Sequence, residues 1–579
     1  MKKLLLGNAA VARGAYEAGV TVVSSYPGTP STEITENIVA YPEIYAEWAP
    51  NEKVAAEVAI GASIAGARAM SCMKHVGMNV MADPMFTVSY IGVNGGLVFC
   101  VADDPGMHSS QNEQDSRHYA KASKIAMLEP ADSSECKEFT KLAYKLSEEF
   151  DTPVIIRLST RVSHSQSMVE LCEREDYKLK DYEKNIAKNV MMPANAIKRH
   201  VDVEKRIASL TDYAENSPLN IEEINNSKIG VITSGISYMY AKEALGDKVN
   251  YLKLGMVYPL PEKKIIDFAA KCEKVYVIEE LDPVFEQHCK ALGIEVIGKE
   301  VFTLLGEYTP QMIKKAVLGE DAPEFASIDE TIPVRPPVMC AGCPHRGTFY
   351  VLKKLGLVVS GDIGCYTLGA VAPLQSVDTT ICMGASVSAA LGMAKARGEE
   401  FNKKLVSVIG DSTFMHSGIT GLVDIVYNKG ANTVIILDNS ITGMTGHQDN
   451  PTTGKTIRGE ETKQVNLIAL CKSIGVERVV VADPFDVKNF EKVVKEETEA
   501  NEPSVIIAQR PCALLKSVKY TGHCTIGENC KKCKLCLKLG CPAISADGDG
   551  VKIDLNQCNG CGLCVNVCPF NAIKKEDNE

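Results

Sequence analysis

The chain of 579 residues is 45% hydrophobic and 23% charged, which is the composition of an ordinary soluble protein, and it is too long for one hydrophobic core, so we expect three or four domains. Its net charge of −11 disfavours a nucleic-acid groove and favours small molecules or other subunits as partners. Nine of its 21 cysteines lie from Cys524 onward, and such clustering without a secretory signal predicts metal ligation rather than disulfides.

The first 190 residues alternate short apolar runs with helix-forming segments, and this pattern predicts an α/β domain with a parallel sheet. Strands are expected at residues 2–6, 21–25, 97–102 and 154–158, and helices at 9–19 and 54–70. The apolar start is interrupted at Gly7, and no apolar run reaches 18 residues, so we expect a cytoplasmic protein without a signal peptide or membrane anchor. The segment Tyr26–Glu33 predicts a turn and a helix start, because Pro30 precedes Ser, Thr and Glu.

A smaller α/β domain is expected over residues 195–325, with strands at 228–234, 249–255, 276–280 and 295–298. It contains no constellation of catalytic groups, so we interpret it as scaffold. The proline-containing stretch 321–337 predicts a linker. Four isolated cysteines are expected to be buried small apolar residues: Cys72, Cys100, Cys136 and Cys382.

The stretch Leu405–Gly446 predicts two parallel strands, 405–409 and 433–437, joined by a helix. Ligands bind at the carboxyl ends of such strands, so Asp411 and Asn439 are expected to reach one site. Their side-chain oxygens and the carbonyl oxygen of Ile441 would suit Mg²⁺, which prefers oxygen ligands and usually bridges to phosphate. Gly410 would let the backbone approach that phosphate. The alternative is that Asp411 only caps a helix.

The tail contains two cysteine runs, Cys530, Cys533, Cys536 and Cys541-Pro, then Cys558, Cys561, Cys564 and Cys568-Pro. This repeat predicts a bacterial two-cluster ferredoxin domain over residues 520–579, in which the fourth cysteine of each run binds the other cluster. One [4Fe–4S] cluster would use Cys530, Cys533, Cys536 and Cys568, and the second would use Cys558, Cys561, Cys564 and Cys541. The first run has one residue more than the common spacing before its last cysteine, Cys541. Zinc is the alternative metal for both runs. Cys524 has no assigned role.

The Asp411…Asn439 pair resembles the Gly-Asp-Gly…Asn motif of thiamine diphosphate enzymes, although Ser412 replaces the third glycine. Four further segments match the alpha subunits of 2-oxoacid:ferredoxin oxidoreductases of the indolepyruvate type: YPGTPSTE (26–33), MCAGCPHR (339–346), GDIGCY (361–366) and MGAS (383–386). The resemblance covers nearly the whole chain. It implies an α/β fold with two doubly wound, parallel-sheet thiamine diphosphate domains, the pyrimidine domain (1–190) and the diphosphate domain (331–518). A transketolase C-terminal-like domain (195–325) would lie between them, and the ferredoxin domain would follow.

The resemblance also implies site residues. Glu52 would be the carboxyl group that hydrogen-bonds the aminopyrimidine ring and activates the coenzyme; Glu57 is the alternative candidate, and a simple dipole interaction of Glu52 with its helix is the alternative role. Thr29 would face a ligand, and Arg117, in the polar loop 103–117, would contact substrate. The implied coenzyme-binding residues are Gly361, Asp362, Gly364, Cys365, Tyr366, Met383, Gly384, Gly410, Asp411, Ser412, Asn439 and Ile441, although close helix packing alone would also explain the small residues at 384–386.

A third [4Fe–4S] cluster is implied by four cysteines at the family's positions: Cys340, Cys343, Cys365 and Cys512. Four thiolates are the set that such a cluster requires. However, Pro344-His345-Arg346 departs from the glycine-rich sequence usual after the first pair. A structural zinc ion or free thiols are therefore the alternatives.

The function that the resemblance implies is oxidative decarboxylation of aryl pyruvates to aryl-acetyl-CoA. Thiamine diphosphate, Mg²⁺ and the clusters would be the cofactors, coenzyme A the co-substrate and ferredoxin the electron acceptor. A smaller beta subunit would complete an α₂β₂ assembly. Three alternatives remain: an oxidoreductase for another 2-oxo acid, a non-redox thiamine diphosphate decarboxylase, and an electron-transfer subunit with an inactive thiamine fold.

Overall fold

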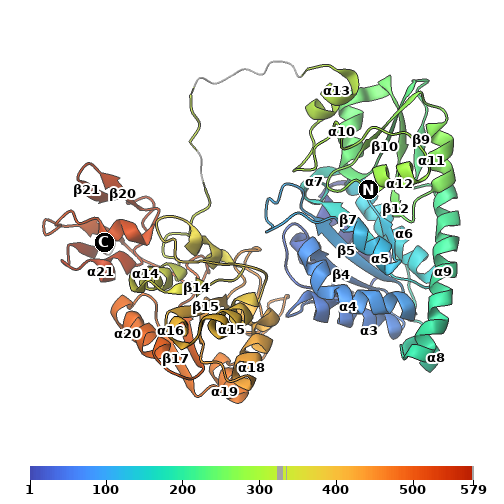
Figure 1. Ribbon diagram of the computed structural model, residues 1–579. Helices are drawn as coiled ribbons and strands as arrows, with labels where there is room; N and C mark the ends of the chain where they lie inside the picture. The colour runs from blue at the N-terminus through green and yellow to red at the C-terminus, as the bar shows by residue number, and fades with distance from the viewer. Residues whose placement is uncertain (322–329, 334–335, 577–579) are drawn as a thin grey trace. The chain divides into compact units, whose positions relative to one another are not determined.

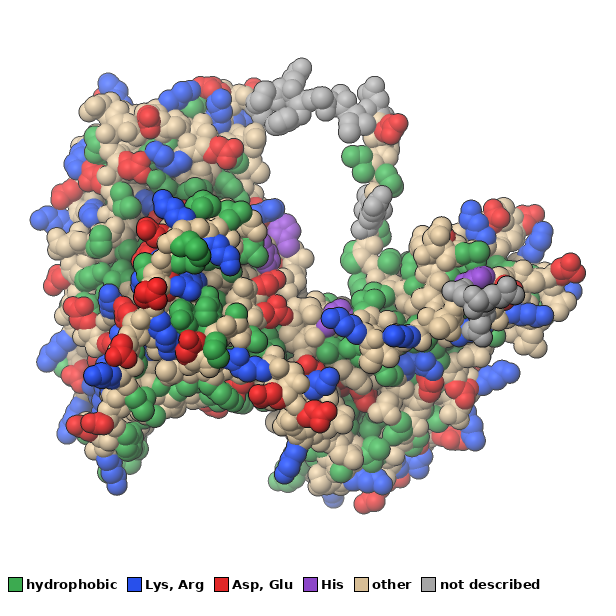
Figure 2. Space-filling view, turned by 180° about the vertical axis from the view of Figure 1, so that it is seen from behind, with side chains coloured by type: hydrophobic (Ala, Val, Ile, Leu, Met, Phe, Trp, Pro, Cys, Tyr) green, Lys and Arg blue, Asp and Glu red, His purple; other side chains and the backbone are tan. Residues whose placement is uncertain are grey.

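The computed structural model describes residues 1–321, 330–333 and 336–576, and the chain divides into two compact units, residues 1–328 and 329–579 (Figure 1). The predicted linker 321–337 and the boundary between the second and third predicted domains lie mostly outside the described residues. On the face of each unit shown in Figure 2, basic and acidic side chains are interspersed. None of the described helices combines the length and the apolar character needed to cross a membrane.

Unit 1 is built on a seven-stranded sheet in which all strands but one are parallel. Its order is β12 (Met256–Tyr258), β6 (Ala126–Leu128), β7 (Val154–Ser159), β5 (Leu97–Asp103), β4 (Ala69–Lys74), β2 (Val22–Ser25) and β3 (Tyr45–Trp48). Side chains alternate between the two faces of β5. Phe99 and Val101 pack in one core with residues of α3 (Glu52–Ile64) and α4 (His75–Ile91), whereas Cys100 lies near Cys136 of α6 (Ser133–Glu149). The first domain is therefore doubly wound, as predicted.

Five further helices belong to the first predicted domain, and a long sixth helix begins just after it. They are α1 (Gly7–Glu17), α2 (Thr32–Ile38), α5 (Arg117–Ser123), α7 (Thr160–His164), α8 (Ile186–Asn189) and the long α9 (Pro193–Asn216) (Figure 1). The predicted strand at 2–6 is present as β1 (Lys2–Leu6), but it pairs antiparallel with β8 (Gln166–Glu170) outside the main sheet. Its first three residues are exposed, which a strand in a sheet covered on both faces does not tolerate.

A four-stranded sheet forms the second half of unit 1, in the order β13 (Lys274–Ile278), β10 (Ile229–Thr233), β11 (Asn250–Lys253) and β9 (Ile221–Glu223). Its helices are α10 (Gly235–Leu245), α11 (Glu262–Ala269), α12 (Val284–Ala291) and α13 (Pro310–Leu318), with the short η1 (Gly246–Lys248). The two sheets share one hydrophobic core, in which Phe99 and Val101 join Ile232 and Leu252. Strand β12 also crosses over to pair with β6 of the larger sheet. The predicted domains 1–190 and 195–325 therefore pack as one body.

Unit 2 is built on a five-stranded parallel sheet with the order β14 (Val358–Ser360), β15 (Leu405–Gly410), β16 (Thr433–Asp438), β18 (Ser504–Gln509) and β17 (Arg478–Ala482). One face packs on α14 (His345–Leu355) and α20 (Val487–Thr498). The other packs on α15 (Ala385–Arg397), α18 (Ile419–Tyr427) and α19 (Leu467–Ile474). Shorter turns are η2 (Cys365–Ala370), α16 (Glu399–Asn402), α17 (Asp411–Thr413) and the π-helical η3 (Phe414–Gly418). The two predicted strands of 405–446 are confirmed.

The cysteine-rich tail consists of two antiparallel strand pairs and two short helices. Strand β19 (His523–Ile526) pairs with β22 (Ile573–Glu576), and β20 (Ile544–Asp547) pairs with β21 (Gly550–Ile553). The helices are η4 (Leu535–Leu539) and α21 (Leu563–Val567). Residues of both helices belong to the same core as Phe349 of α14 and Phe490 of α20, which cover one face of the larger sheet. The tail therefore packs directly on the preceding domain.

Of the four isolated cysteines, Cys72, Cys100 and Cys136 are buried as predicted. Cys382 is exposed, so the prediction was wrong there. It lies in the loop before α15, where the backbone carries the residue to the surface.

Candidate functional site

Three oxygen-bearing groups meet at the carboxyl edge of the sheet in unit 2. Asp411 directly follows β15 and Asn439 directly follows β16, and the parallel pairing of Gly410 with Leu437 brings them to the same edge. One end of the Asn439 amide lies 2.7 Å from the carbonyl oxygen of Ile441 and 3.1 Å from Oδ1 of Asp411. With the amide oxygen at that position, the three oxygens form the donor set that Mg²⁺ prefers. With the amide nitrogen there, Asn439 bridges the other two by hydrogen bonds.

The electrostatics of this edge suit a cation. Asp411 is 2% exposed, and burial together with the charge of Asp438 raises the pKa of its carboxyl to about 7. The hydroxyl of Thr452 donates to its Oδ2 at 3.0 Å and only partly offsets this cost. A divalent ion would stabilise the ionised carboxylate. The residues present therefore fit the predicted metal.

Asp362 holds two predicted coenzyme segments together. Its buried carboxylate accepts hydrogen bonds from the backbone N–H groups of Ile363 (2.8 Å), Gly384 (2.9 Å) and Ser386 (3.0 Å). The turn 361–366 is thereby fixed to the start of α15, although burial still raises the pKa of the carboxyl. In this arrangement Asp362 faces backbone rather than solvent, which favours a role in shaping the site over direct contact with the coenzyme.

Tyr366 fills the space between the two glycine turns. Its hydroxyl donates to the carbonyl oxygen of Ile363 at 3.0 Å. A Cβ atom at Gly410 would lie 2.7 Å from the ring, and one at Gly364 only 2.4 Å. Gly410 is therefore needed to admit this ring, a packing reason that the sequence did not reveal. The other predicted coenzyme residues lie around this turn: Gly361 beside Thr379, Cys365 at the start of η2, Met383 and Gly384 before α15, and Ser412 accepting from the Thr442 hydroxyl at 2.9 Å.

His345 is a neighbour of the metal edge that sequence reasoning did not identify. It is 3% exposed, its Nε2 lies 3.4 Å from Nδ2 of Asn439, and its ring meets that of Tyr366 edge to face at 5.8 Å. Burial lowers the pKa of His345 to about 4. A neutral ring nitrogen can accept from the Asn439 N–H, which turns the amide oxygen toward Asp411 and Ile441. The signal was present in the departure of Pro344-His345-Arg346 from the glycine-rich pattern.

The structure brings together the four cysteines of the predicted third set. Burial raises the pKa of Cys365 to about 11, and the neighbouring Cys512 and Cys340 add to the shift. Cys343 is likewise influenced by Cys340 and Cys365. The backbone N–H of Cys512 donates to the carbonyl oxygen of Asn439 at 2.9 Å. This cysteine set therefore lies directly beside the metal edge.

Two cavities in the tail separate the remaining cysteines as the repeat predicts. One is lined by Cys530, Cys533, Cys536 and Cys568. The other is lined by Cys541, Cys558, Cys561 and Cys564, together with Cys524. The fourth cysteine of each run thus lies with the first three of the other run, and the additional residue before Cys541 does not displace it. The backbone N–H of Cys524 donates to Sγ of Cys558 at 3.3 Å, so the unassigned thiol belongs to the surroundings of the second cavity.

Arg346 connects the third cysteine set to the second cavity. Its side chain is 2% exposed and lines that cavity. The guanidinium donates to the carbonyl oxygens of Leu539 (2.8 Å) and Gly540 on one side, and of Met339 and Cys340 (3.1 Å) on the other. Asn559 adds a hydrogen bond of 3.0 Å to the carbonyl oxygen of Ala341. The Cys340–Cys343 loop is therefore fixed against the tail.

In unit 1, Glu52 is the first residue of α3 and is 4% exposed. It lies against Gly77 of α4, where a Cβ atom would come within 2.5 Å of its Oε1. Glu57, the alternative candidate, is exposed and pairs with Lys53 on the surface. Thr29 is half-buried and is joined to Pro30 by a cis peptide bond. The burial of Glu52 favours it over Glu57 as the activating carboxyl group.

Arg117 is tied into a buried network instead of lying open to a ligand. Its side chain is 2% exposed. It donates to Asp115 and, at 2.6 Å, to Glu279, and also to the carbonyl oxygens of Glu280 and Asp282. These bonds join the 103–117 loop to the second sheet. Its predicted contact with substrate stays a prediction, and the geometry favours a structural role.

We expect Arg117→Met to destabilise unit 1 by about 3–5 kcal/mol, because Asp115 and Glu279 would be left as buried, unpaired carboxylates. Thermal and denaturant unfolding of the full chain would measure the loss. Arg161→Met is the matched control, since that arginine pairs with Glu307 at the surface, and it should change the stability by less than about 1 kcal/mol. Equal stability of the two variants would contradict the structural role.

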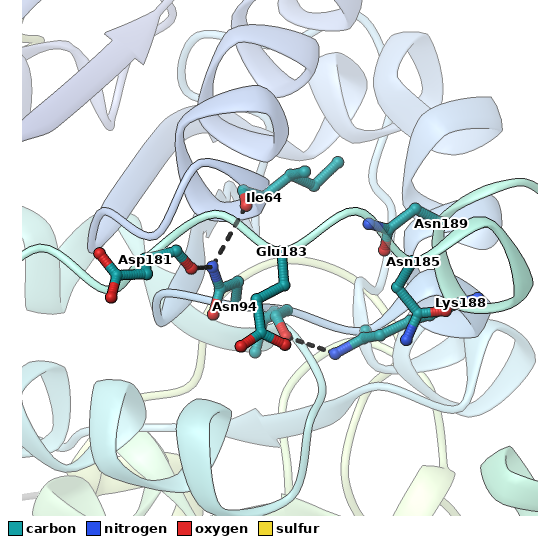
Figure 3. Close-up of a pocket in the computed structure, with 9 residues that line it drawn as sticks. Ile64, Asn94, Asp181, Glu183, Asn185, Lys188 and Asn189 are labelled. Carbon is teal, nitrogen blue, oxygen red and sulfur yellow. Dashed lines mark hydrogen bonds between the residues drawn. The ribbon is translucent and has the colours of Figure 1, made fainter.

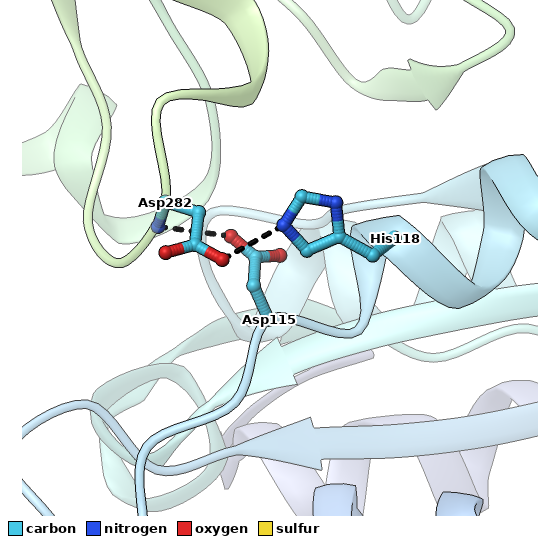
Figure 4. A group of neighbouring side chains, drawn as sticks. All are labelled: Asp115, His118 and Asp282. Carbon is cyan, nitrogen blue, oxygen red and sulfur yellow. Dashed lines mark hydrogen bonds and ion pairs between the residues drawn. The ribbon is translucent and has the colours of Figure 1, made fainter.

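Two further features of unit 1, a cluster of possible metal ligands and a pocket, are already satisfied by contacts of the chain itself. Asp115, His118 and Asp282 bring ligand atoms within 4.8 Å of one another (Figure 4), but Asp115 is already engaged by Arg117 and by the backbone N–H of Asp282. A pocket of about 380 Å³ lies between residues 92–94 and 181–189 (Figure 3). There the amide of Asn94 donates to the carbonyl oxygens of Ile64 and Asp181, so this amide is already used in hydrogen bonds within the pocket wall.

Comparison with known proteins identifies the family. Three family models match: "Pyruvate flavodoxin/ferredoxin oxidoreductase, thiamine diP-bdg" over residues 13–228, "Thiamine pyrophosphate enzyme, C-terminal TPP binding domain" over 362–508, and "4Fe-4S binding domain" over 551–574. They confirm the predicted thiamine diphosphate and ferredoxin folds and the binding of thiamine diphosphate and [4Fe–4S] clusters. A solved 2-oxoglutarate:ferredoxin oxidoreductase from Magnetococcus marinus matches over 55% of this chain and 65% of its own, with 20% identity and a TM-score of 0.47.

Two curated relatives match over almost their whole length. Indolepyruvate oxidoreductase subunit IorA from Archaeoglobus fulgidus is 41% identical over 99% of this chain and 97% of its own. The protein of the same name from Pyrococcus abyssi is 40% identical over 99% and 96%. The chain therefore belongs to the indolepyruvate oxidoreductase IorA family, the thiamine diphosphate-dependent alpha subunits with a ferredoxin tail.

Proposed function

We propose that the chain catalyses the ferredoxin-linked oxidative decarboxylation of aryl pyruvates, indolepyruvate among them, to the corresponding aryl-acetyl-CoA. It would act in the cytoplasm with a smaller beta subunit in an α₂β₂ assembly. The relatives named for indolepyruvate support the substrate class. The observation that carries the proposal is in unit 2, where the oxygen edge of Asp411, Asn439 and Ile441 adjoins a connected series of cysteine sets.

Each residue has a defined part in this proposal. Bound thiamine diphosphate supplies an electron sink for decarboxylation. Asp411, Asn439 and the Ile441 carbonyl would hold Mg²⁺ for its diphosphate, and His345 would keep the Asn439 oxygen turned toward the metal. Glu52 would hold a proton at the aminopyrimidine ring, in a setting from which water is excluded. Asp362 and Tyr366 shape the turns on which these groups stand.

Three [4Fe–4S] clusters would carry the electrons away, one in each cysteine set. The set of Cys340, Cys343, Cys365 and Cys512 lies next to the metal edge through the Cys512–Asn439 hydrogen bond. Arg346 and Asn559 join its loop to the cavity of Cys541, Cys558, Cys561 and Cys564. The cavity of Cys530, Cys533, Cys536 and Cys568 would follow. Electrons would therefore leave through the tail.

Cys568→Ser and Cys541→Ser are expected each to remove one cluster, because each thiol lies in the cavity of the other run. If all three sets are filled, iron content should fall by roughly one third in either variant. Iron and sulfide analysis with EPR spectra of the reduced protein would measure this. Cys172→Ser, at an exposed cysteine of unit 1, is the control. Loss of iron in Cys524→Ser but not in Cys541→Ser would reassign the ligand.

The activity is tested with the chain co-expressed with its beta subunit. Reduction of a low-potential dye should depend strictly on both a 2-oxo acid and coenzyme A, and indolepyruvate and phenylpyruvate should exceed pyruvate and 2-oxoglutarate in kcat/KM. Carbon dioxide release without dye reduction would instead indicate a non-redox decarboxylase. Failure of every 2-oxo acid with an intact cluster spectrum would indicate an electron-transfer subunit.

A further inference from the structure

Lys74 is an unusually buried cation at a ligand-binding position of unit 1. It is the last residue of β4, an inner strand of the seven-stranded sheet, and ligands bind at the carboxyl ends of such strands. Its side chain is only 8% exposed, whereas lysine is almost never so buried without a charged partner. The aliphatic part of the Lys74 side chain packs against Gly28, where a Cβ atom would lie 3.1 Å from Cγ of Lys74.

The ammonium group uses one of its donors. Nζ donates to the carbonyl oxygen of Ser109, in the 103–117 loop, at 2.6 Å. An ammonium group has three N–H donors, and across residues 1–321, 330–333 and 336–576 no second acceptor lies within hydrogen-bond distance. Two donors of a buried cation therefore remain available.

The neighbouring acids do not neutralise Lys74. Asp104 and Glu52 are the acidic groups whose charges act on it, and within the described residues neither is close enough to form an ion pair. The Asp104 carboxylate is occupied by the backbone N–H of Ser109 and the hydroxyls of Ser110 and Thr160. Burial consequently lowers the pKa of Lys74 to about 8, against the opposing effect of the two acids. Burying a charge with unused N–H donors costs free energy unless a ligand supplies the missing acceptors.

Building on the proposed function, we propose that Lys74 binds the carboxylate of the 2-oxo acid substrate. Three segments implicated by the sequence surround it: Gly28 precedes Thr29, Ser109 belongs to the predicted substrate loop, and Glu52 is the predicted activator. A carboxylate would accept the two remaining N–H donors and supply the missing negative charge. The aryl group of the substrate would then be distinguished by other residues, while Lys74 recognises the feature that all 2-oxo acids share.

The test compares two unreactive analogues, 3-(indol-3-yl)propionate and its neutral amide, by calorimetric binding to the thiamine diphosphate-loaded holoenzyme. The wild-type enzyme should bind the acid about 10–100-fold more tightly than the amide, as for a charge-assisted hydrogen bond. Lys74→Met should bring this ratio close to one by weakening the acid alone, and Lys74→Arg should retain part of the preference. Lys121→Met, at an exposed lysine of α5, should leave the ratio unchanged.

Three results would overturn the assignment. The first is an unchanged ratio of acid to amide affinity in Lys74→Met. The second is an equal loss of affinity for acid and amide, which would indicate a purely structural lysine. The third is a loss of affinity for coenzyme A instead, which would make the phosphates of coenzyme A the anion bound by Lys74. The proposed function is judged separately. If wild-type enzyme reduces dye with indolepyruvate while Lys74→Met keeps its acid preference, only the Lys74 assignment fails.

Discussion

Asp411→Ala is expected to weaken the binding of thiamine diphosphate in the presence of Mg²⁺ by at least ~100-fold, because even residues that only support metal ligands are worth 10–100-fold in affinity. Asp411 would supply the single charged ligand of the proposed metal edge, since Asn439 and the Ile441 carbonyl are neutral. Calorimetric titration of the holoenzyme freed of coenzyme would measure the change. Asp424→Ala, at an exposed residue of α18, is the control, and unchanged coenzyme binding in Asp411→Ala would remove the metal assignment.

In the coenzyme-free protein, the Asp411 carboxylate that favours coenzyme binding should lower the free energy of unfolding. Burial raises the pKa of Asp411 to about 7, above the value near 3.9 of an unfolded aspartate. Ionising it in the folded state therefore costs free energy, a cost that grows as pH rises between those two values and is complete above about 7. Asp411→Asn should remove it and raise the unfolding temperature at pH 8 but not at pH 4. A variant that loses coenzyme binding yet gains stability cannot be explained by misfolding.

Local sequence was sufficient wherever the chemistry follows directly from a strand end or a fixed spacing. Asp411 and Asn439 end neighbouring parallel strands, so their meeting could be predicted from two apolar runs and the helix between them. The tail cysteines are equally local, and the cavities pair Cys568 and Cys541 with the opposite runs as the repeat predicts.

The features that escaped prediction depend on contacts between distant parts of the chain. One of the two carboxylates paired with Arg117 belongs to Glu279, 162 residues away, and no local sequence pattern predicts that contact. Strand β12 belongs to the second predicted domain by sequence but extends the larger sheet of the first, so the predicted domain boundary does not divide the core. Lys74 and His345 carry no motif of their own, and their burial becomes visible only when Gly28 and Asn439 are brought beside them.

In this chain His345 and Arg346 take the place of the glycine-rich sequence expected after the first cysteine pair, and each side chain has a defined contact. His345 faces the metal edge through Asn439, whereas Arg346 faces the second cysteine cavity. Two adjacent residues at the start of α14 therefore connect the proposed coenzyme site with the proposed route of electron exit. A glycine-rich loop would offer neither side chain.

Glu52→Gln is expected to lower kcat by about 10²–10⁴-fold while changing the affinity for thiamine diphosphate only a few-fold, because glutamine keeps the shape and hydrogen bonding of the side chain but cannot exchange a proton. The two effects separate an activating carboxyl group from a residue that merely favours the helix dipole, whose neutralisation would cost a few tenths of a kcal/mol and little activity. Dye reduction with indolepyruvate and coenzyme A would give kcat, and calorimetry would give the coenzyme affinity.

Glu57→Gln provides the matched control, because it makes the same glutamate-to-glutamine change at an exposed position five residues further along α3. It should leave kcat within about twofold, since surface pairs such as Lys53–Glu57 contribute little. A direct measurement strengthens the comparison: exchange of the thiazolium C2 proton of bound coenzyme, followed by NMR in D₂O, should slow in Glu52→Gln and not in Glu57→Gln. If exchange slows only in Glu57→Gln, the activating carboxyl group lies one turn further along α3, and the burial of Glu52 against Gly77 has a packing role alone.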